Sequence, residues 1–456
     1  MHRVMKRTWI MGIFLLVLLG GMVFFLWEYA TDAPEWVGYP RSPHGLQNGL
    51  GRGAVYDSDG EVLMTLDGGK HYSSDAETRK STLHWLGDLS GSIRAPAISN
   101  YRSSMSGYDL VNGIYNYSEG SGEIHLTLSS RVQNAAYRAM NGRKGTVAVY
   151  NYKTGEILCA VTGPTFDPAN VPDIEGDTTG AYEGVYLNRF VQSTYIPGSI
   201  FKVVTTAAAL DCVDGIEDMT FTCQGVLPYG DQKVSCEKVH GTLDLKGALA
   251  HSCNCCFAQI AELVGRKNME KYVKEFGLLD AISFDGITTA AGSYDISDAA
   301  PVSFAWSCIG QYTDLVNPCN FMTFMGAIAG DGQAAKPFIE SRVTDGTDTT
   351  YEAKTEKTGR ILSREVAETV QSYMRGAVEQ IYGAGNFPGL TVCAKSGTCQ
   401  LGGGKTYNAM FAGFVADEDY PLAFIVVLEN AGYGASACVP VLRPVLAECK
   451  AVLDGR

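Results

Sequence analysis

The sequence predicts an α+β fold that follows one membrane-spanning helix, and three observations support this prediction. Strand-like segments lie on both sides of a region in which helical patterns dominate, as expected for an antiparallel sheet flanked by helices. A long apolar run without charges lies near the N-terminus. The composition, 46% apolar and 19% charged, is that of a folded globular protein and excludes a disordered chain.

The apolar run covers residues 8–27, and a helix of this length spans about 30 Å, the thickness of a bilayer core. Arg3, Lys6 and Arg7 precede it, whereas acidic residues follow it. The positive-inside rule therefore predicts a cytoplasmic tail at residues 1–7 and an extracytoplasmic body. A cleaved signal peptide is the alternative, but the run exceeds the usual apolar region of about 7–15 residues and no A-x-A site follows.

Residues 28–123 are expected to form a linker and a small membrane-proximal module. The stretch Ala33–Gly53 is rich in Pro and Gly and is typical of a linker. Residues Ala54–Leu66 predict a hairpin, and polar loops rich in Ser, Gly and Tyr follow it. The module is shorter than the domain that a second enzyme would need.

Residues 124–456 are expected to form the α+β domain, because periodic segments now follow one another closely. The predicted strands are Ile124–Leu128, the hairpin Gly145–Thr162, Leu390–Gly397, Ala409–Val415 and Leu422–Glu429. The predicted helices are Arg131–Met140, Ser199–Leu210, Leu243–Val264, Cys319–Ala329 and Ser363–Ile381.

Three short motifs in this domain suggest chemistry. They are an S-x-x-K motif at Ser199–Lys202, an S-x-N motif at Ser252–Asn254 and a K-S-G-T motif at Lys395, Ser396, Gly397 and Thr398. None is convincing alone, because the chain repeats them by chance: Ser235–Lys238 is a second S-x-x-K, and Lys153–Gly155 and Lys357–Gly359 are both K-T-G. The structural context of each copy must therefore decide which copy is functional.

Context favours Ser199 and Lys395. Ser199 follows a Pro-Gly step and opens an apolar helix, so Lys202 lies one turn away on the same face. Apolar neighbours disfavour the charged ammonium of Lys202, which makes it a candidate base for a serine nucleophile. Ser235 lies in a polar stretch without a helix start. Lys395 continues an apolar strand-like segment, where an ammonium and hydroxyls could hold a carboxylate.

The chain resembles the class B (monofunctional) penicillin-binding proteins, the peptidoglycan D,D-transpeptidases, which carry these three motifs in this order. The resemblance begins at about Gly51 and continues to the C-terminus. The further segments that carry it are Arg52–Asp57 with Asp59-Gly60, Leu126–Leu128 with Gln133, Thr154–Leu158 with Phe166–Pro168, Asn188-Arg189 with Tyr195–Ser199, His240-Gly241, Ile309–Gln311 and Phe411–Phe414.

The resemblance implies a transpeptidase domain and a covalent acyl-transfer cycle. Ser199 would attack the D-Ala–D-Ala carbonyl of a stem peptide, and Lys202 would accept its proton. The backbone N–H groups of Ser199 and Thr398 would form an oxyanion hole. Ser252 and Asn254 would relay protons and orient the donor peptide. The remaining motif residues would bind its terminal carboxylate: Lys395, Ser396, Gly397 and Thr398.

The resemblance also implies partners. These are peptidoglycan stem peptides, β-lactam antibiotics that acylate Ser199, the cell membrane, and a glycosyltransferase or other divisome or elongasome proteins. No cofactor and no metal are expected. Nucleic acid is excluded as a general partner, because the net charge is −13 and no basic run occurs.

Other activities share these motifs. A D,D-carboxypeptidase uses water as acceptor, and a β-lactamase-like hydrolase needs a further base, for which no carboxylate motif is found. A bifunctional enzyme would need a glycosyltransferase domain that residues 28–123 are too short to hold. A β-lactam sensor would need a larger cytoplasmic part than seven residues, and an inert division scaffold would be expected to lose its catalytic residues.

The 13 cysteines all lie beyond residue 27, in the predicted extracytoplasmic part. An oxidising compartment would normally pair them, so we hypothesise a reducing or anoxic exterior. Cys253, Cys255 and Cys256 cluster around the S-x-N motif. They suggest either a metal or redox site, or small residues that pack a buried helix. The second interpretation is favoured, because no second ligand group lies near them in the sequence.

Overall fold

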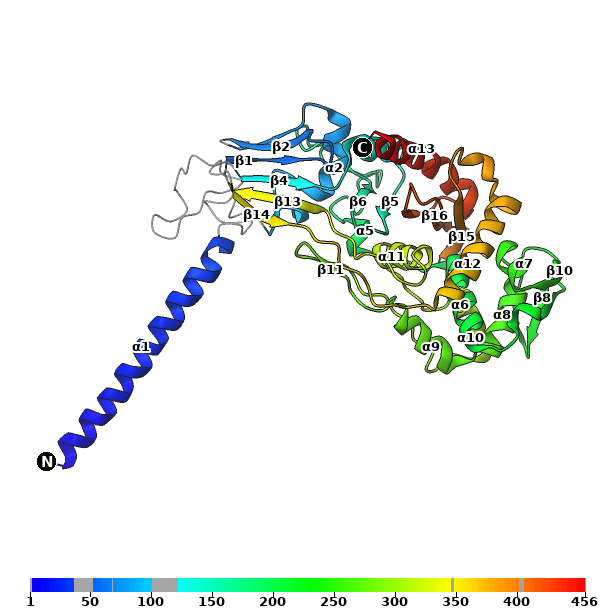
Figure 1. Cartoon of the computed structure of the whole chain (residues 1–456), viewed down its shortest axis with the longest axis horizontal. Coiled ribbons are helices and arrows are strands. Elements are labelled where there is room, and N and C mark those ends of the chain that lie inside the picture. Colours follow the sequence, from blue (N-terminus) through cyan, green and yellow to red (C-terminus); the bar gives the residue numbers. More distant parts are fainter. Residues whose placement is uncertain are drawn as a thin grey trace.

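The computed structural model describes residues 2–36, 52–67, 69–100, 122–345, 348–401 and 406–455 (Figure 1). Its first element is the long helix α1, His2–Trp36. Within it, Val4–Thr31 is long and apolar enough to cross a membrane, with a mean hydropathy of 2.6. The predicted spanning segment 8–27 lies inside this stretch. Most of the predicted linker, residues 37–51, and the predicted polar loops at 101–121 lie outside the described residues.

A five-stranded antiparallel sheet forms the centre of the body, in the order β15-β16-β17-β5-β6. It brings together strands from both ends of the domain, as the sequence predicted. The strands are β5 Gly145–Asn151, β6 Ile157–Gly163, β15 Val392–Leu401, β16 Thr406–Val415 and β17 Leu422–Leu428. Strand β15 is at the edge, so one side of it is available to another element.

Helices cover both faces of this sheet, which explains why β5, β6 and β17 are buried at every position. Successive side chains of a strand point to opposite faces. Thus Val147 and Val149 join the core of α4, Ser130–Met140, and α13, Gly434–Asp454. Ala148 and Tyr150 join the larger core that contains α11, Pro318–Ala329.

The helical region lies on the α11 side of the sheet (Figure 1). Its other elements are α5 Arg189–Gln192, a 3₁₀ turn Gly198–Phe201, α6 Lys202–Cys212, a 3₁₀ turn Ile216–Asp218, α7 Leu245–Ala250, α8 Asn254–Val264, α9 Arg266–Glu275, β11 Ser283–Phe284, β12 Ile287–Thr288, α10 Pro301–Ser307, α12 Arg364–Ala377, a π-helical turn Val378–Tyr382 and a 3₁₀ turn Ala384–Asn386.

Two predicted helices differ from the structure at functionally important points. The predicted helix 199–210 begins with a 3₁₀ turn, and α6 proper starts only at Lys202. The predicted helix 243–264 is two helices, α7 and α8, separated at residues 251–253. Ser252 takes the left-handed conformation there, with φ of 54°, which an α-helix cannot include. The apolar pattern continues across this break, so the sequence alone could not locate it.

Four short strands between α6 and α8 form two small sheets that the sequence did not predict; only the stretch around Ser235 was expected to be a polar loop, and residues 243–244 were expected to be helical. Strand β7, Thr220–Cys223, pairs with β10, Gly241–Asp244, and β8, Val226–Tyr229, pairs with β9, Gln232–Ser235. We call residues 220–244 the β-appendage. Most of its side chains are exposed, so its strands lack the apolar alternation from which strands are predicted.

The membrane-proximal module contains a six-stranded sheet, in the order β14-β13-β4-β1-β2-β3, at the opposite end of the body from the β-appendage (Figure 1). The predicted hairpin at its start is confirmed. The predicted boundary at residue 124 falls inside this sheet, because three of its strands follow residue 121. The elements are β1 Arg52–Tyr56, β2 Val62–Asp67, β3 Lys70–Tyr72, α2 Ala76–Leu86, a 3₁₀ turn Pro96–Ile98, β4 Gly122–Leu126, β13 Glu340–Asp345 and β14 Asp348–Glu352.

An ion pair between Arg79 of α2 and Asp167 fastens the module to the central domain. Arg79 Nε and Nη2 donate to the two carboxylate oxygens of Asp167, each at 2.7 Å. The side chains are only 15% and 12% exposed. The hydrogen bonds from Arg79 lower the pKa of Asp167. This pair gives a structural role to Phe166–Pro168, one of the segments on which the family resemblance rests.

Replacing Asp167 with Asn should therefore destabilise the chain by about 1.5–3 kcal/mol, as for loss of hydrogen bonds to a charged group. The effect should be present in full above the ordinary carboxyl pKa of about 3.9 and should vanish as the pH falls through the lowered pKa of Asp167, because the carboxyl of the wild-type chain is then protonated in both the folded and the unfolded state. Urea denaturation of the full chain in detergent measures it. The exposed pair Arg138–Glu77, 2.6 Å apart, is the matched control. Glu77→Gln should change stability by less than about 1 kcal/mol, and an equal loss in both variants would contradict the role of Asp167.

Candidate active site

Three glycines allow the turn that carries Ser199 to touch the edge strand β15. Gly198 has φ of 57°, and a Cβ atom there would lie 2.7 Å from the carbonyl oxygen of Thr398. A Cβ at Gly397 would lie 2.8 Å from another carbonyl of the turn, and one at Gly310 would lie 2.1 Å from the carbonyl of Gly198. Any side chain at these positions would push the turn from the strand. The S-x-x-K and K-S-G-T motifs are thus held together by backbone contact.

Lys202 lies at the start of α6 and is completely buried. Its Nζ lies 2.8 Å from Ser199 Oγ and 3.1 Å from Ser252 Oγ. It also lies 2.7 Å from Asn254 Oδ1 and 2.9 Å from the carbonyl oxygen of Ser252. Every polar neighbour of this amine therefore belongs to the S-x-x-K or S-x-N motif.

These four neighbours orient a neutral amine. A neutral amine has two N–H groups and one lone pair. The carbonyl of Ser252 and Oδ1 of Asn254 can only accept, so they take the two N–H groups. The lone pair is then left for a hydroxyl that can donate its proton, and that of Ser199, at 2.8 Å, is nearer than that of Ser252, at 3.1 Å. The orientation of the Asn254 amide is fixed, because its Nδ2 donates to the carbonyl of Ser235 at 2.9 Å.

Ser252 links the two buried lysines. Its Oγ lies 3.1 Å from Lys202 Nζ and 3.0 Å from Lys395 Nζ. The left-handed backbone of Ser252, at the break between α7 and α8, turns the side chain to this position. A hydroxyl that accepts from one amine can donate to another group, so Ser252 can pass a proton along this row.

Lys395 lies on β15 and is also completely buried. Its Nζ donates to the carbonyl of Ser396 at 2.8 Å and to the hydroxyl of Tyr382 at 3.2 Å. The Tyr382 hydroxyl also accepts from Ser396 N at 3.1 Å and lies 3.0 Å from Ser396 Oγ. Tyr382 thus positions two residues of the K-S-G-T motif. The sequence analysis missed Tyr382, because it matches no motif and lies in a π-helical turn that an α-helical pattern does not reveal.

Burial shifts the titration of both amines. Desolvation, and after it the charge of Lys395, lowers the pKa of Lys202 to about 7. Desolvation also lowers the pKa of Lys395 to about 7. Loss of hydration disfavours the ammonium form, so a neutral amine becomes available near neutral pH. This is the state that a base beside a serine hydroxyl requires.

The remaining motif residues face the same place, and most of them are accessible. Ser199, Ser252, Asn254, Ser396 and Thr398 are half-buried, whereas Gly397 is buried between β15 and the turn. The Thr398 hydroxyl accepts from Gly434 N at 3.0 Å, at the start of α13. The structure therefore brings together all eight predicted site residues, with two buried amines beneath a row of accessible hydroxyl and amide groups.

The repeated motifs lie elsewhere, as their sequence context predicted. Ser235 is exposed on β9, where no helix begins. Lys153 is exposed at the turn between β5 and β6, and Lys357 is exposed in a segment that follows β14. Lys153 and Lys357 do not contact the site described above, and Ser235 contacts it only through its backbone carbonyl, which accepts from Asn254 Nδ2.

The interpretation of the cysteine cluster needs one correction. The packing interpretation was favoured because no second ligand group lies near Cys253 in the sequence. In the folded chain, however, such groups do lie beside Cys253. Cys223, Cys236 and His240 of the β-appendage lie around Cys253, with all four ligand atoms within 4.8 Å of one another. Cys255 and Cys256 are buried among apolar residues of α8, as expected for packing.

Comparison with known proteins identifies the family of this chain. The family described as the penicillin binding protein transpeptidase domain matches residues 145–447. The peptidoglycan D,D-transpeptidase PbpA of Mycolicibacterium smegmatis is 29% identical over 72% of this chain and 72% of its own length. Stage V sporulation protein D of Bacillus subtilis is 25% identical over 85% of this chain and 60% of its own length.

Solved structures show the same fold. The D,D-transpeptidase domain of a peptidoglycan glycosyltransferase from Eggerthella lenta is similar with a TM-score of 0.76 and 25% identity, over 89% of this chain and 99% of that one. Penicillin-binding protein A from M. tuberculosis, as a ceftriaxone acyl-enzyme complex, gives 0.72 at 22% identity, over 88% and 99%. The extent of the family match, together with the three motifs joined in one site, shows that this chain belongs to the class B penicillin-binding proteins, the family of the peptidoglycan D,D-transpeptidases.

Proposed function

We propose that the chain is a membrane-anchored serine D,D-transpeptidase that cross-links peptidoglycan stem peptides through an acyl-enzyme on Ser199, and that β-lactams inhibit it by acylating the same residue. The observation that carries this proposal is the 2.8 Å approach of Lys202 Nζ to Ser199 Oγ. The burial of Lys202, which lowers its pKa to about 7, supplies a base in the right protonation state.

In the first half-reaction Lys202 takes the hydroxyl proton of Ser199. Oγ then forms a bond to the carbonyl carbon of the penultimate D-Ala of a stem peptide. Backbone N–H groups of Ser199 and Thr398 stabilise the oxyanion. The C–N bond breaks, and the terminal D-Ala leaves with a proton returned from Lys202 through Ser252, whose hydroxyl lies 3.1 Å from the amine.

In the second half-reaction an amine of another stem peptide attacks the acyl group. Its proton returns to Ser199 Oγ through Lys202, and the cross-linked peptide leaves. Lys395, Ser396 and Thr398 bind the carboxylate of the donor. The position of Lys395 Nζ, 3.0 Å from Ser252 Oγ, also lets its charge favour a proton on the leaving amine rather than on Lys202.

The helix Val4–Thr31 serves as a single-pass anchor with a cytoplasmic N-terminus, since its basic residues precede the apolar run. The enzyme then acts outside the membrane, where it would meet a glycosyltransferase or other divisome or elongasome proteins. A D,D-carboxypeptidase is the second candidate function, because the same two amines and Ser199 can pass the acyl group to water.

The nucleophile can be tested by covalent labelling. The full chain in detergent should form an adduct with a fluorescent penicillin, and Ser199→Ala should abolish it, since the hydroxyl of Ser199 is the nearest one to Lys202 Nζ, at 2.8 Å, whereas Ser252 serves as the proton relay. In-gel fluorescence measures the adduct. Ser235→Ala, in the second S-x-x-K, is the matched control and should label normally. Labelling of the Ser199→Ala variant would contradict the proposal.

Acylation should also depend on pH. The neutral form of Lys202 dominates above its pKa of about 7, so the second-order rate of acylation should rise as the pH increases through this value. Each pH unit below 7 should lower the rate about tenfold. Stopped-flow measurement with a fluorescent penicillin between pH 5 and pH 8 checks this. A rate that stays constant across this range would contradict a base of lowered pKa.

The acceptor distinguishes the two candidate functions. With a stem-peptide or thioester donor and a D-amino acid, a transpeptidase should release mainly the aminolysis product, because the amine competes with water for the acyl group on Ser199. Mass spectrometry measures the product ratio. The Ser199→Ala variant controls for uncatalysed reaction. Hydrolysis alone, at a high concentration of amine, would show a carboxypeptidase instead.

A further inference from the structure

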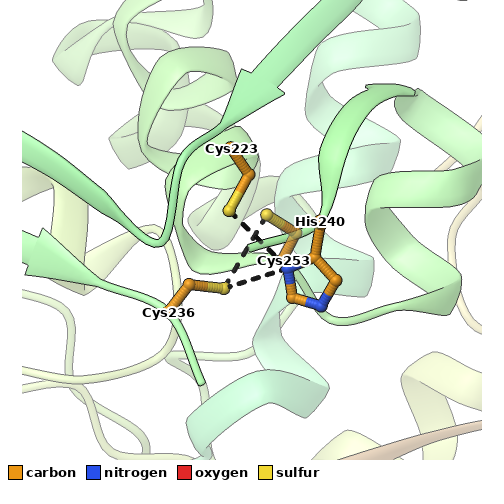
Figure 2. A group of neighbouring side chains, drawn as sticks. All are labelled: Cys223, Cys236, His240 and Cys253. Atoms are coloured by element: carbon orange, nitrogen blue, oxygen red, sulfur yellow. Dashed lines mark hydrogen bonds between the residues drawn. The ribbon is translucent and has the colours of Figure 1, made fainter. Parts of the chain in front are cut away.

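Four side chains that take no part in the catalytic row converge on one point beside the β-appendage. They are Cys223 at the end of β7, Cys236 after β9, His240 before β10 and Cys253 at the N-cap of α8. Figure 2 shows their sulfur atoms and the His240 ring turned toward one another. Cys223 and Cys253 are buried, and the other two are half-buried. Three thiols and an imidazole are the ligands that zinc prefers in proteins.

The distances fit a tetrahedral ion. Zn–S bonds of about 2.3 Å and Zn–N bonds of about 2.0 Å place two sulfur ligands about 3.8 Å apart and a sulfur about 3.5 Å from a nitrogen. Cys236 Sγ lies 3.8 Å from Cys253 Sγ and 3.4 Å from His240 Nδ1. Cys223 Sγ lies 3.6 Å from the same nitrogen. A disulfide would instead need about 2.05 Å between sulfur atoms.

Each of the three sulfur atoms accepts a backbone N–H, as thiolate ligands of a metal commonly do. Gly225 N donates to Cys223 at 3.4 Å. Asn254 N donates to Cys236 at 3.3 Å, and Cys256 N donates to Cys253 at 3.5 Å. The last two donors belong to the first turn of α8, where the helix dipole also favours negative charge. The surroundings thus suit three thiolates.

The β-appendage also needs a cross-link. A two-stranded hairpin is marginally stable in water, and this segment consists of two such pairs. Phe221, Cys223 and Val234 are its fully buried apolar side chains, and Leu227, Tyr229 and Leu243 are partly buried against the same core, so the apolar area of the β-appendage is small for 25 residues. Metal binding contributes directly to the folding of small elements of this kind.

We propose that Cys223, Cys236, His240 and Cys253 bind a structural zinc ion that holds the S-x-N motif in place. The three thiols bind as thiolates and release their protons to solvent, and His240 binds as a neutral imidazole through Nδ1. All four ligands come from the protein, so the ion has no open position for substrate and acts structurally.

The site is continuous with the catalytic machinery. Cys253 lies between Ser252 and Asn254 in the chain, and Cys236 accepts the backbone N–H of Asn254. Asn254 Oδ1 in turn accepts from Lys202. The zinc ligands are therefore positioning residues: they fix the loop whose two polar side chains orient the base.

Metal content tests the assignment. The full chain, purified in detergent under a reducing, metal-free buffer after growth in zinc, should contain about one zinc ion per chain by mass spectrometry of the metal. Replacing zinc with Co²⁺ should give the thiolate-to-cobalt charge-transfer band and the intense visible bands of a tetrahedral site. Absence of zinc, binding of cobalt without the charge-transfer band, or a disulfide between Cys236 and Cys253 in the peptide map would overturn the assignment.

Variants identify the ligands. Cys236→Ser and His240→Ala should each lower zinc to a small fraction of the wild-type content. Cys236→His keeps a ligand and should retain zinc, which separates loss of the site from misfolding. Cys255→Ser and His251→Ala change the same residue types nearby and should retain a full complement. Equal zinc in Cys236→Ser, His240→Ala and the wild type would show that these residues are not the ligands.

The positioning role needs a catalytic readout. Stripping zinc from the wild-type chain with a chelator should slow acylation of Ser199 by about 10–100-fold, and added Zn²⁺, but not Mg²⁺, should restore it. Ser199 remains competent in principle, so residual labelling is expected, unlike in Ser199→Ala. Unchanged acylation after the zinc is lost would overturn the positioning role. The measurement of zinc content tests the metal site independently of the proposed function, because the zinc content does not depend on whether the acyl acceptor is an amine or water.

Discussion

The geometry of the site depends on two buried amines that share one hydroxyl. Lys202 and Lys395 lie within 3.1 Å and 3.0 Å of Ser252 Oγ, in surroundings that exclude water. Two full positive charges so close together and so poorly hydrated would repel each other strongly. The protein therefore favours a state with one neutral amine. This constraint leaves one amine able to accept a proton, and Ser199 Oγ is the hydroxyl nearest to Lys202 Nζ.

Holding this arrangement requires three separate parts of the chain to meet without intervening side chains. Gly198, Gly310 and Gly397 let a turn, a loop and an edge strand approach at backbone distance. The break between α7 and α8 brings Ser252 into the left-handed conformation that its position between the lysines needs. The hydroxyl of Tyr382 then fixes the K-S-G-T motif, because it accepts hydrogen bonds from Lys395 Nζ and from Ser396 N. The catalytic row is thus rigid because each member is held by backbone geometry.

The β-appendage adds a second support on the opposite side of the S-x-N motif. Its strands bury too little apolar area to hold a loop firmly, whereas four ligands on one ion can do so. The proposed zinc site and the lysine pair meet at residues 252–254, where successive side chains point alternately to the lysine pair and to the cysteines. Ser252 and Asn254 face Lys202, and Cys253 faces the other cysteines. In the proposed zinc site, three of the cysteines that are unusual for a predicted extracytoplasmic body share one structural role.

The sequence by itself determined the apolar N-terminal helix, the α+β class, most helices and strands of the transpeptidase domain, and the eight motif residues that meet at the site. These properties follow from local periodicity and from motif order, which the linear chain contains. The tertiary structure decided what local patterns do not encode. The apolar pattern of residues 243–264 runs through the break at Ser252, because both helices bury the same face. Tyr382 and the ligands Cys223, Cys236 and His240 are separated in sequence from the motifs they support, so only the folded chain brings them within bonding distance.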